Sequence, residues 1–229
     1  MKPFIALAVF TAAALHAQAQ SIVYSSYGTG LWVGDSQSFA PIAEYSMDLN
    51  GDGVNDFRFV AEDPFGGGLY LEPQNQNGVL GYPDSALRVS FRVRRLLAGA
   101  DISAGATATG LEWVGYEPNP RSSVTGPYLL YNQSFGGDGG GEFVARLPMG
   151  TTEGYVGVQF YAADGLHYGW IRVRGGNYND GRILDYAYNA VPGQSISVGA
   201  VPEPSTWALI VLGTAALWKL RRPSSSPSA

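Results

Sequence analysis

The chain has 229 residues, of which 45% are hydrophobic and only 14% are charged, and its formal net charge is −5. The low charge and the 13% aromatic content exclude a disordered chain. The acidic balance argues against nucleic-acid binding, which needs a basic face. The 31 Gly and 14 Pro favour many turns over a helical bundle, and the absence of Cys excludes disulfides and cysteine zinc sites.

Residues 1–19 have the pattern of a secretory signal peptide. Lys2 precedes an apolar run over residues 4–15, and Ala17-Gln18-Ala19 supplies a small-residue cleavage site. A run this short predicts a cleaved export signal better than a membrane-spanning helix. A buried N-terminal helix is the alternative interpretation. We expect the mature chain to begin near Gln20.

Residues 20–200 have the pattern of one β domain. Residues 87–94 alternate apolar and polar side chains, as expected of a strand with one buried face, and residues 155–161 and 170–174 behave in the same way. Further short strands are predicted at 22–27, 42–47, 57–61, 69–72, 111–116, 128–132, 142–147, 183–188 and 195–198. Many short strands between turn residues, with no helical period, predict an all-β fold, an antiparallel, jelly-roll-like β-sandwich.

A segment rich in Asp and Asn lies between the second and third of these strands. Asp48, Asn50 and Asp52 place an oxygen at every second position, and the Val54 carbonyl and the Asp56 carboxylate follow. This spacing matches the start of a D-x-[DN]-x-[DN]-G calcium loop, and Ca²⁺ takes six to eight hard oxygen ligands. The segment predicts a structural calcium site.

The flanking residues separate this segment from an EF-hand. Position twelve is Phe59 rather than a bidentate Glu, and strands flank the loop instead of helices. The segment resembles the D-x-N-x-D-G-x-x-D-[LF] turns of extracellular β proteins, in which a calcium ion fastens a hairpin. Glu44, Glu62 or Asp63 could complete the shell. The alternative is a metal-free turn, since Asn and Asp favour such turns in any case.

Three arginines lie on one face of the predicted strand over residues 87–94, at Arg88, Arg92 and Arg94. One interpretation is cross-strand pairing with acidic side chains. The other is binding of an acidic polysaccharide, because guanidinium groups pair with uronate carboxylates through two parallel hydrogen bonds.

The catalytic candidates are weak. His167 would need Asp164 or Asp185 and a serine to make a triad, and the chain has no G-x-S-x-G segment. A glycoside hydrolase needs two carboxylates at a fixed separation, and no spacing singles out a pair. The available glutamates are Glu112, Glu117, Glu142 and Glu153. We therefore expect a non-enzymatic protein, with a secreted carbohydrate-active enzyme, of the hydrolase or lyase kind, as the alternative.

The last part of the chain has the pattern of a membrane anchor. Its residues Val201, Pro202, Glu203 and Pro204 predict an extended segment, because the prolines exclude a helix. An apolar run over residues 207–218 predicts a short transmembrane helix. Basic side chains that stay on the cytoplasmic side close this run, at Lys219, Arg221 and Arg222.

This order of motif, apolar run and cations resembles the PEP-CTERM sorting signal of Gram-negative bacteria, over residues 201–222. The resemblance implies recognition by an exosortase near Pro202-Glu203-Pro204, anchoring in the inner membrane during sorting, and a final place on the cell surface or in the extracellular matrix. It also implies neighbouring extracellular polysaccharide. The polar tail at 223–229 departs from the family pattern, which ends just after its arginines.

Overall fold

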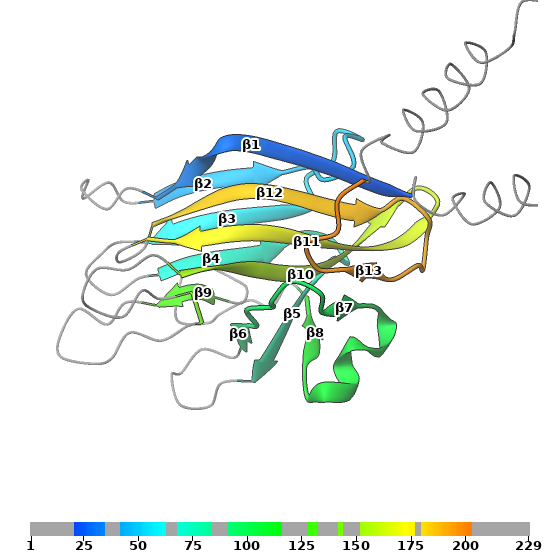
Figure 1. Cartoon of the computed structure of the whole chain (residues 1–229). Coiled ribbons are helices and arrows are strands. Elements are labelled where there is room, and N and C mark those ends of the chain that lie inside the picture. The colour runs from blue at the N-terminus through cyan, green and yellow to red at the C-terminus, as the bar shows by residue number, and fades with distance from the viewer. Residues whose placement is uncertain are drawn as a thin grey trace, which may run out of the picture. The chain divides into compact units, whose positions relative to one another are not determined.

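Short strands joined by turns make up the part of the chain that the computed structural model describes, residues 21–34, 42–62, 68–83, 91–115, 128–131, 142–143, 152–176 and 180–202 (Figure 1). The strands are β1 (Ile22–Val33), β2 (Ile42–Met47), β3 (Phe57–Glu62), β4 (Gly68–Pro73), β5 (Gly78–Pro83), β6 (Phe91–Val93), β7 (Asp101–Ile102), β8 (Glu112–Val114), β9 (Tyr128–Tyr131), β10 (Thr152–Ala162), β11 (Gly165–Gly175), β12 (Gly181–Asn189) and β13 (Ile196–Ser197). A single 3₁₀ turn, η1 (Ala104–Thr109), is the one helical element of these residues. The predicted all-β class is confirmed.

Eleven of the strands form one hydrogen-bonded sheet in the order β1-β12-β11-β10-β5-β6-β9-β4-β3-β2, with β8 also paired to β5. Every pairing in this sheet is antiparallel except the short contact between β6 and β9. Strands β7 and β13 form a separate antiparallel pair. The described strands are thus antiparallel almost throughout, as predicted.

The hairpin of β10 and β11 is the most regular part of the sheet. Its register runs without a shift from Thr152 opposite Gly175 to Ala162 opposite Gly165, so only two residues remain for the turn. Gly165 has a φ of 138°, a conformation that the tight turn requires and that glycine adopts without strain. This hairpin contains both of the predicted strands at 155–161 and 170–174.

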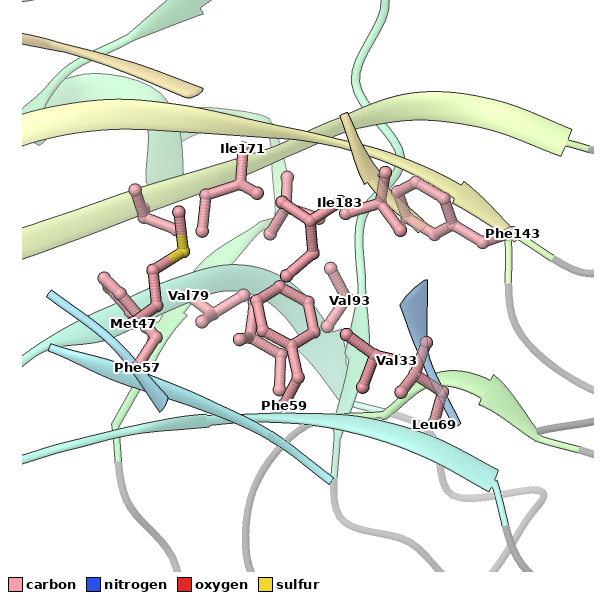
Figure 2. Close-up of a cluster of buried hydrophobic side chains, with 14 of the residues drawn as sticks. Val33, Met47, Phe57, Phe59, Leu69, Val79, Val93, Phe143, Ile171 and Ile183 are labelled. Atoms are coloured by element: carbon pink, nitrogen blue, oxygen red, sulfur yellow. The ribbon is translucent and has the colours of Figure 1, made fainter. Parts of the chain in front are cut away.

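The main hydrophobic core contains side chains from two parts of the sheet that are far apart in its strand order. Met47, Phe57 and Phe59 come from β2 and β3, and Ile171 and Ile183 come from β11 and β12. All five are at most 1% exposed. Figure 2 shows the two groups pointing toward one another. Burial of each such side chain contributes about 1.5–3 kcal/mol.

A second core covers the other face of β10, β11 and β12. Tyr168 and Trp170 of β11 pack there with Leu80 of β5 and with Ile102 and Ile196 of the β7–β13 pair. Strand β11 is therefore buried on both faces, because its alternate residues Ile171 and Val173 face the main core.

Several strand boundaries differ from the sequence predictions. Strand β1 runs six residues beyond the predicted end at Tyr27, because Gly28 and Gly30, with φ values of 63° and 93°, form a bulge where the sequence indicates a turn. The sequence does not predict strand β5, because two Gly and a Pro lie in its six residues. Glu142 and Phe143 lie in a turn rather than in the predicted strand. Of the predicted strand at 87–94, the structure describes residues 91–94 and has a strand over Phe91–Val93.

Residues Ser21–Val201 form one compact unit. The predicted signal peptide, the C-terminal helix and the polar tail lie outside the described residues. No helix among the residues that are described is both long enough and apolar enough to cross a membrane. The sandwich and jelly-roll arrangement remains a prediction.

Gly169 should be sensitive to a single added methyl group. A Cβ at this position would lie 2.7 Å from the carbonyl oxygen of Ala187 on the neighbouring strand, and this backbone atom cannot move without breaking the β11–β12 ladder. We expect Gly169→Ala to lower the free energy of unfolding by about 1–3 kcal/mol, as overpacking does. Urea denaturation measures the change.

Gly115→Ala is the matched control. Its added Cβ would lie 3.7 Å from the carbonyl oxygen of Asn77, which is an ordinary van der Waals distance. Equal stabilities of the two variants would contradict the packing described for β11 and β12.

Candidate functional site

The loop between β2 and β3 gathers the side chains of the predicted calcium site. Asp48 accepts the backbone N–H of Gly51 at Oδ1 (2.7 Å) and that of Gly53 at Oδ2 (2.8 Å). Asp52 accepts the N–H of Val54 at 2.8 Å. Both glycines have positive φ values, 75° and 86°, so the chain can turn tightly around the Asp48 carboxylate. The loop is a series of side-chain-to-backbone turns.

The outer side of this loop carries oxygen donors. Asn50 accepts the Asp52 N–H at 3.1 Å and donates from Nδ2 to Asp52 Oδ2 at 3.0 Å. Each carboxylate oxygen of Asp48 and Asp52 accepts one hydrogen bond and retains further acceptor capacity. Asp52 is exposed, and so is the side chain of Val54, whose carbonyl was the predicted fourth ligand. Carboxylate and amide oxygens of this kind fit Ca²⁺.

Asp56 lies on the inner side of the loop. It is 4% exposed, and it accepts the Leu49 N–H at Oδ2 (2.8 Å) and the Asn77 amide at Oδ1 (3.0 Å). The Asn77 amide oxygen in turn accepts the N–H of Tyr161 on β10 at 3.0 Å. Asp56 therefore fastens the loop to the interior. Asn77 has no motif around it, and nothing in the sequence singles it out.

No three His, Cys, Asp or Glu side chains within the described ranges are grouped so that they could hold a metal ion. The oxygen donors that the loop brings together on its outer side are those of Asp48, Asn50 and Asp52. Of the residues considered to complete the shell, Glu44 pairs with Arg58 at 3.2 Å, and the side chains of Glu62 and Asp63 lie outside the description.

The environment of Asp56 changes its acidity. Burial raises the pKa of its carboxyl to about 6 from an ordinary value of 3.8. The hydrogen bonds from Leu49 and Asn77 lower the pKa, and the negative charges of Asp48 and Asp52 raise it. The folded protein therefore holds a proton at pH values where the unfolded chain has released it.

Asp56 should make the folded state less stable as the pH rises from about 4 to 6. In this window the folded state binds more protons than the unfolded state, so the free energy of unfolding falls with pH, by up to about 3 kcal/mol from this group. Urea denaturation at several pH values in EDTA measures the slope. Asp56→Asn should reduce it.

Asp101→Asn is the control for this pH dependence, because Asp101 is exposed on β7 and should leave the slope unchanged. A slope that Asp56→Asn does not alter would contradict a buried, protonatable Asp56.

The arginines of the predicted glycan-binding row have partners within the chain. Arg94 pairs with Glu142 at 2.8 Å, and the guanidinium of Arg92 lies 5.8 Å from the centre of the Tyr82 ring. Arg88 lies outside the described residues. These contacts agree with the alternative of intramolecular pairing.

The candidate catalytic side chains are also engaged elsewhere. His167 is 2% exposed, and its ring nitrogens contact the Asn189 carbonyl oxygen (2.8 Å) and Asp164 (2.9 Å), so neither is left for a serine hydroxyl. The hydrogen bond from His167 lowers the pKa of Asp164. Glu142 accepts hydrogen bonds from Tyr82 and Arg94, and Glu153 from Arg172 and Arg174.

The sorting residues lie at the end of the description. Val201 and Pro202 are exposed and follow directly after the β unit, whereas Glu203, Pro204, Lys219, Arg221 and Arg222 lie outside the described residues. In the sequence, the antiparallel β unit is followed by a Pro-Glu-Pro segment, an apolar run and a basic cluster, which is the order of a C-terminal sorting segment.

The comparison with protein families identifies this segment. The PEP-CTERM protein-sorting motif matches residues 200–222, so the chain carries a PEP-CTERM sorting domain, as predicted. This domain marks proteins of Gram-negative bacteria for export and membrane-anchored sorting, and an exosortase recognises it. No curated protein and no solved structure matches the chain.

Proposed function

We propose that this protein is a non-enzymatic β-sandwich protein that is presented on the cell surface or in the extracellular matrix, associates with acidic polysaccharide and is stabilised by calcium. The observation that carries the proposal is the sorting motif at residues 200–222, which begins at the C-terminal end of the compact unit Ser21–Val201. A β domain in this position is the part of the molecule that sorting would deliver outside the cell.

The contacts of three candidate catalytic residues support a non-enzymatic role. The His167 imidazole has both nitrogens occupied, and Glu142 and Glu153 are each bound by arginine side chains. Carboxylates whose oxygens already accept hydrogen bonds from neighbouring side chains are not placed to donate a proton to a glycosidic oxygen, as a general acid must. A secreted carbohydrate-active enzyme remains the alternative, without a specific contact in its favour.

The calcium part of the proposal rests on the loop between β2 and β3. Asp48, Asn50 and Asp52, with the Val54 carbonyl, would hold the ion, and the predicted ligand Asp56 would have to turn outward from its contacts with Leu49 and Asn77. The ion would offset the repulsion between the carboxylates and so fasten β2 to β3.

Sorting predicts a processed chain. In a host with an exosortase, the surface form should begin near Gln20 and lack the residues after the Pro202-Glu203-Pro204 motif, and intact mass spectrometry reads both ends. Glu203→Ala should leave the protein in the inner membrane, if the enzyme reads this carboxylate.

Glu112→Ala makes the same chemical change at an exposed position of β8 and should be processed normally. A strain without the exosortase should accumulate the anchored precursor. A surface form that still ends at Ala229 would overturn the proposed sorting.

Calcium should raise the melting temperature by about 2–4 °C. A ligand bound only by the folded state adds RT ln(1 + [L]/Kd), about 1 kcal/mol at 5 mM CaCl₂ for a Kd of about 1 mM, which is typical of extracellular sites. Thermal unfolding of the full-length chain with calcium, with EDTA and with magnesium measures the effect. Magnesium should substitute poorly, because it demands a tighter octahedral shell.

Asp52→Ala should abolish the calcium effect, whereas Asp101→Ala, at another exposed acid, should retain it. Identical melting curves in calcium and in EDTA would show that the loop is an ordinary Asx-rich turn.

A further inference from the structure

Four side chains form a row across one face of the sheet at its β1 edge. Glu153 of β10 lies opposite Arg174 of β11, Arg174 lies opposite Arg182 of β12, and Arg182 lies opposite Trp32 of β1. Directly opposed residues on neighbouring strands project to the same face of a sheet. The row therefore brings two guanidinium groups and an indole together. The four strands are hydrogen-bonded neighbours in the order β1-β12-β11-β10, and Figure 1 labels each of them.

The two arginines of this row differ in their partners. Arg174 donates from Nε and Nη2 to Glu153 Oε2, at 3.1 and 2.8 Å, and Glu153 also accepts from Arg172. Arg172 additionally pairs with the buried Asp185. By contrast, Arg182 forms no ion pair with any carboxylate in the described part of the chain. Its guanidinium donates a hydrogen bond to the Thr29 carbonyl oxygen at 3.1 Å.

Arg182 is nevertheless held in place. Its guanidinium lies 3.9 Å from the centre of the Trp32 ring, which is a close cation–π contact. The bulge in β1 makes room for it, since a Cβ at Gly30 would lie 3.3 Å from the Cβ and Cδ of Arg182. Ordering of both side chains before a ligand arrives lowers the entropic cost of binding.

Trp32 remains accessible. The residue is 53% exposed, more than any other large aromatic residue within the described ranges. An exposed indole offers an apolar surface that the C–H groups of a ligand ring can cover, and water is released when they do so. The site thus combines an exposed indole ring with an ordered cation that pairs with no carboxylate of the described residues.

We propose that Trp32 and Arg182 form a binding site for the carboxylate-bearing sugar residues of an acidic polysaccharide. The C–H face of a pyranose ring would cover the indole, and the carboxylate would accept hydrogen bonds from the guanidinium, which suits carboxylate geometry. The site rests on the polysaccharide association proposed above and assigns it to β1 and β12 instead of to the predicted row of Arg88, Arg92 and Arg94.

The test is calorimetric titration of the full-length chain, purified in a mild detergent, with oligogalacturonate and with a cello-oligosaccharide of the same length. The uronate oligomer should bind and the neutral one should bind at least about tenfold more weakly, because a charge-assisted hydrogen bond contributes this much. Added salt should weaken uronate binding, since exposed charges are screened over about 8 Å at physiological ionic strength.

Variants locate the site. Trp32→Ala and Arg182→Gln should each weaken uronate binding about tenfold or more, and Arg182→Lys should fall between wild type and Arg182→Gln because it keeps the charge and loses the fork. Tyr161→Ala removes another aromatic side chain, 50% exposed, and should leave binding unchanged. Circular dichroism and the melting temperature check that each variant is folded.

Two results would overturn the inference in different ways. Uronate binding that survives Trp32→Ala and Arg182→Gln, or that falls instead with Arg92→Gln or Arg94→Gln, would place the site elsewhere and leave the polysaccharide association standing. Wild-type protein that binds neither oligomer would overturn the association as well, while the sorting of the protein, read by mass, would be unaffected.

Discussion

The double-faced burial of β11 is the constraint on which the rest of the described unit depends. Ile171 and Val173 lie in the main core, while Tyr168 and Trp170 lie in the second core on the other face. A strand in this position cannot shift its register by one residue without exchanging the two sets of side chains. Its long pairings with β10 and β12 hold that register, and both cores are built against it. The position of the edge strand β1 depends on β12, with which it pairs.

The loop between β2 and β3 is coupled to this hairpin through a buried amide. The Asn77 side-chain amide donates to the carboxylate and the backbone carbonyl of Asp56, and its Oδ1 accepts the Tyr161 N–H near the end of β10. A single asparagine thus connects the loop between β2 and β3 with the β10–β11 hairpin. The same contacts separate two roles within the acidic segment. Asp48 and Asp52 shape the exposed turn, whereas Asp56 anchors it from below.

Local patterns predict the local structure of this chain well. The alternation in residues 155–161 and 170–174 corresponds to β10 and β11, which pair without a register shift. The Asp48–Asp56 segment indeed connects two paired strands. What periodicity cannot show is the order of strands, because β10 pairs with β5, from which it is distant in the sequence. It also cannot show which acid turns inward, since burial of Asp56 depends on Asn77. Strand β5 escapes notice because Gly81 signals a turn, although a Cβ there would lie 2.5 Å from the Arg92 carbonyl oxygen, so close strand packing requires this glycine.

The same limit applies to the arginines, because the sequence does not show which of them has an acidic partner. Alternation along one strand places Arg92 and Arg94 together, and the structure gives Arg94 a carboxylate and Arg92 a tyrosine. Arg182 stands alone in its segment, and only the pairing of β12 with both β11 and β1 brings it beside Arg174 and Trp32. Like charges that face each other across a ladder destabilise it unless each is compensated. Glu153 compensates the charge of Arg174, and the Trp32 ring contacts the guanidinium of Arg182. The ring covers only the face of the Arg182 guanidinium. The N–H groups at its edge are therefore the part of the row that can still bind an anion.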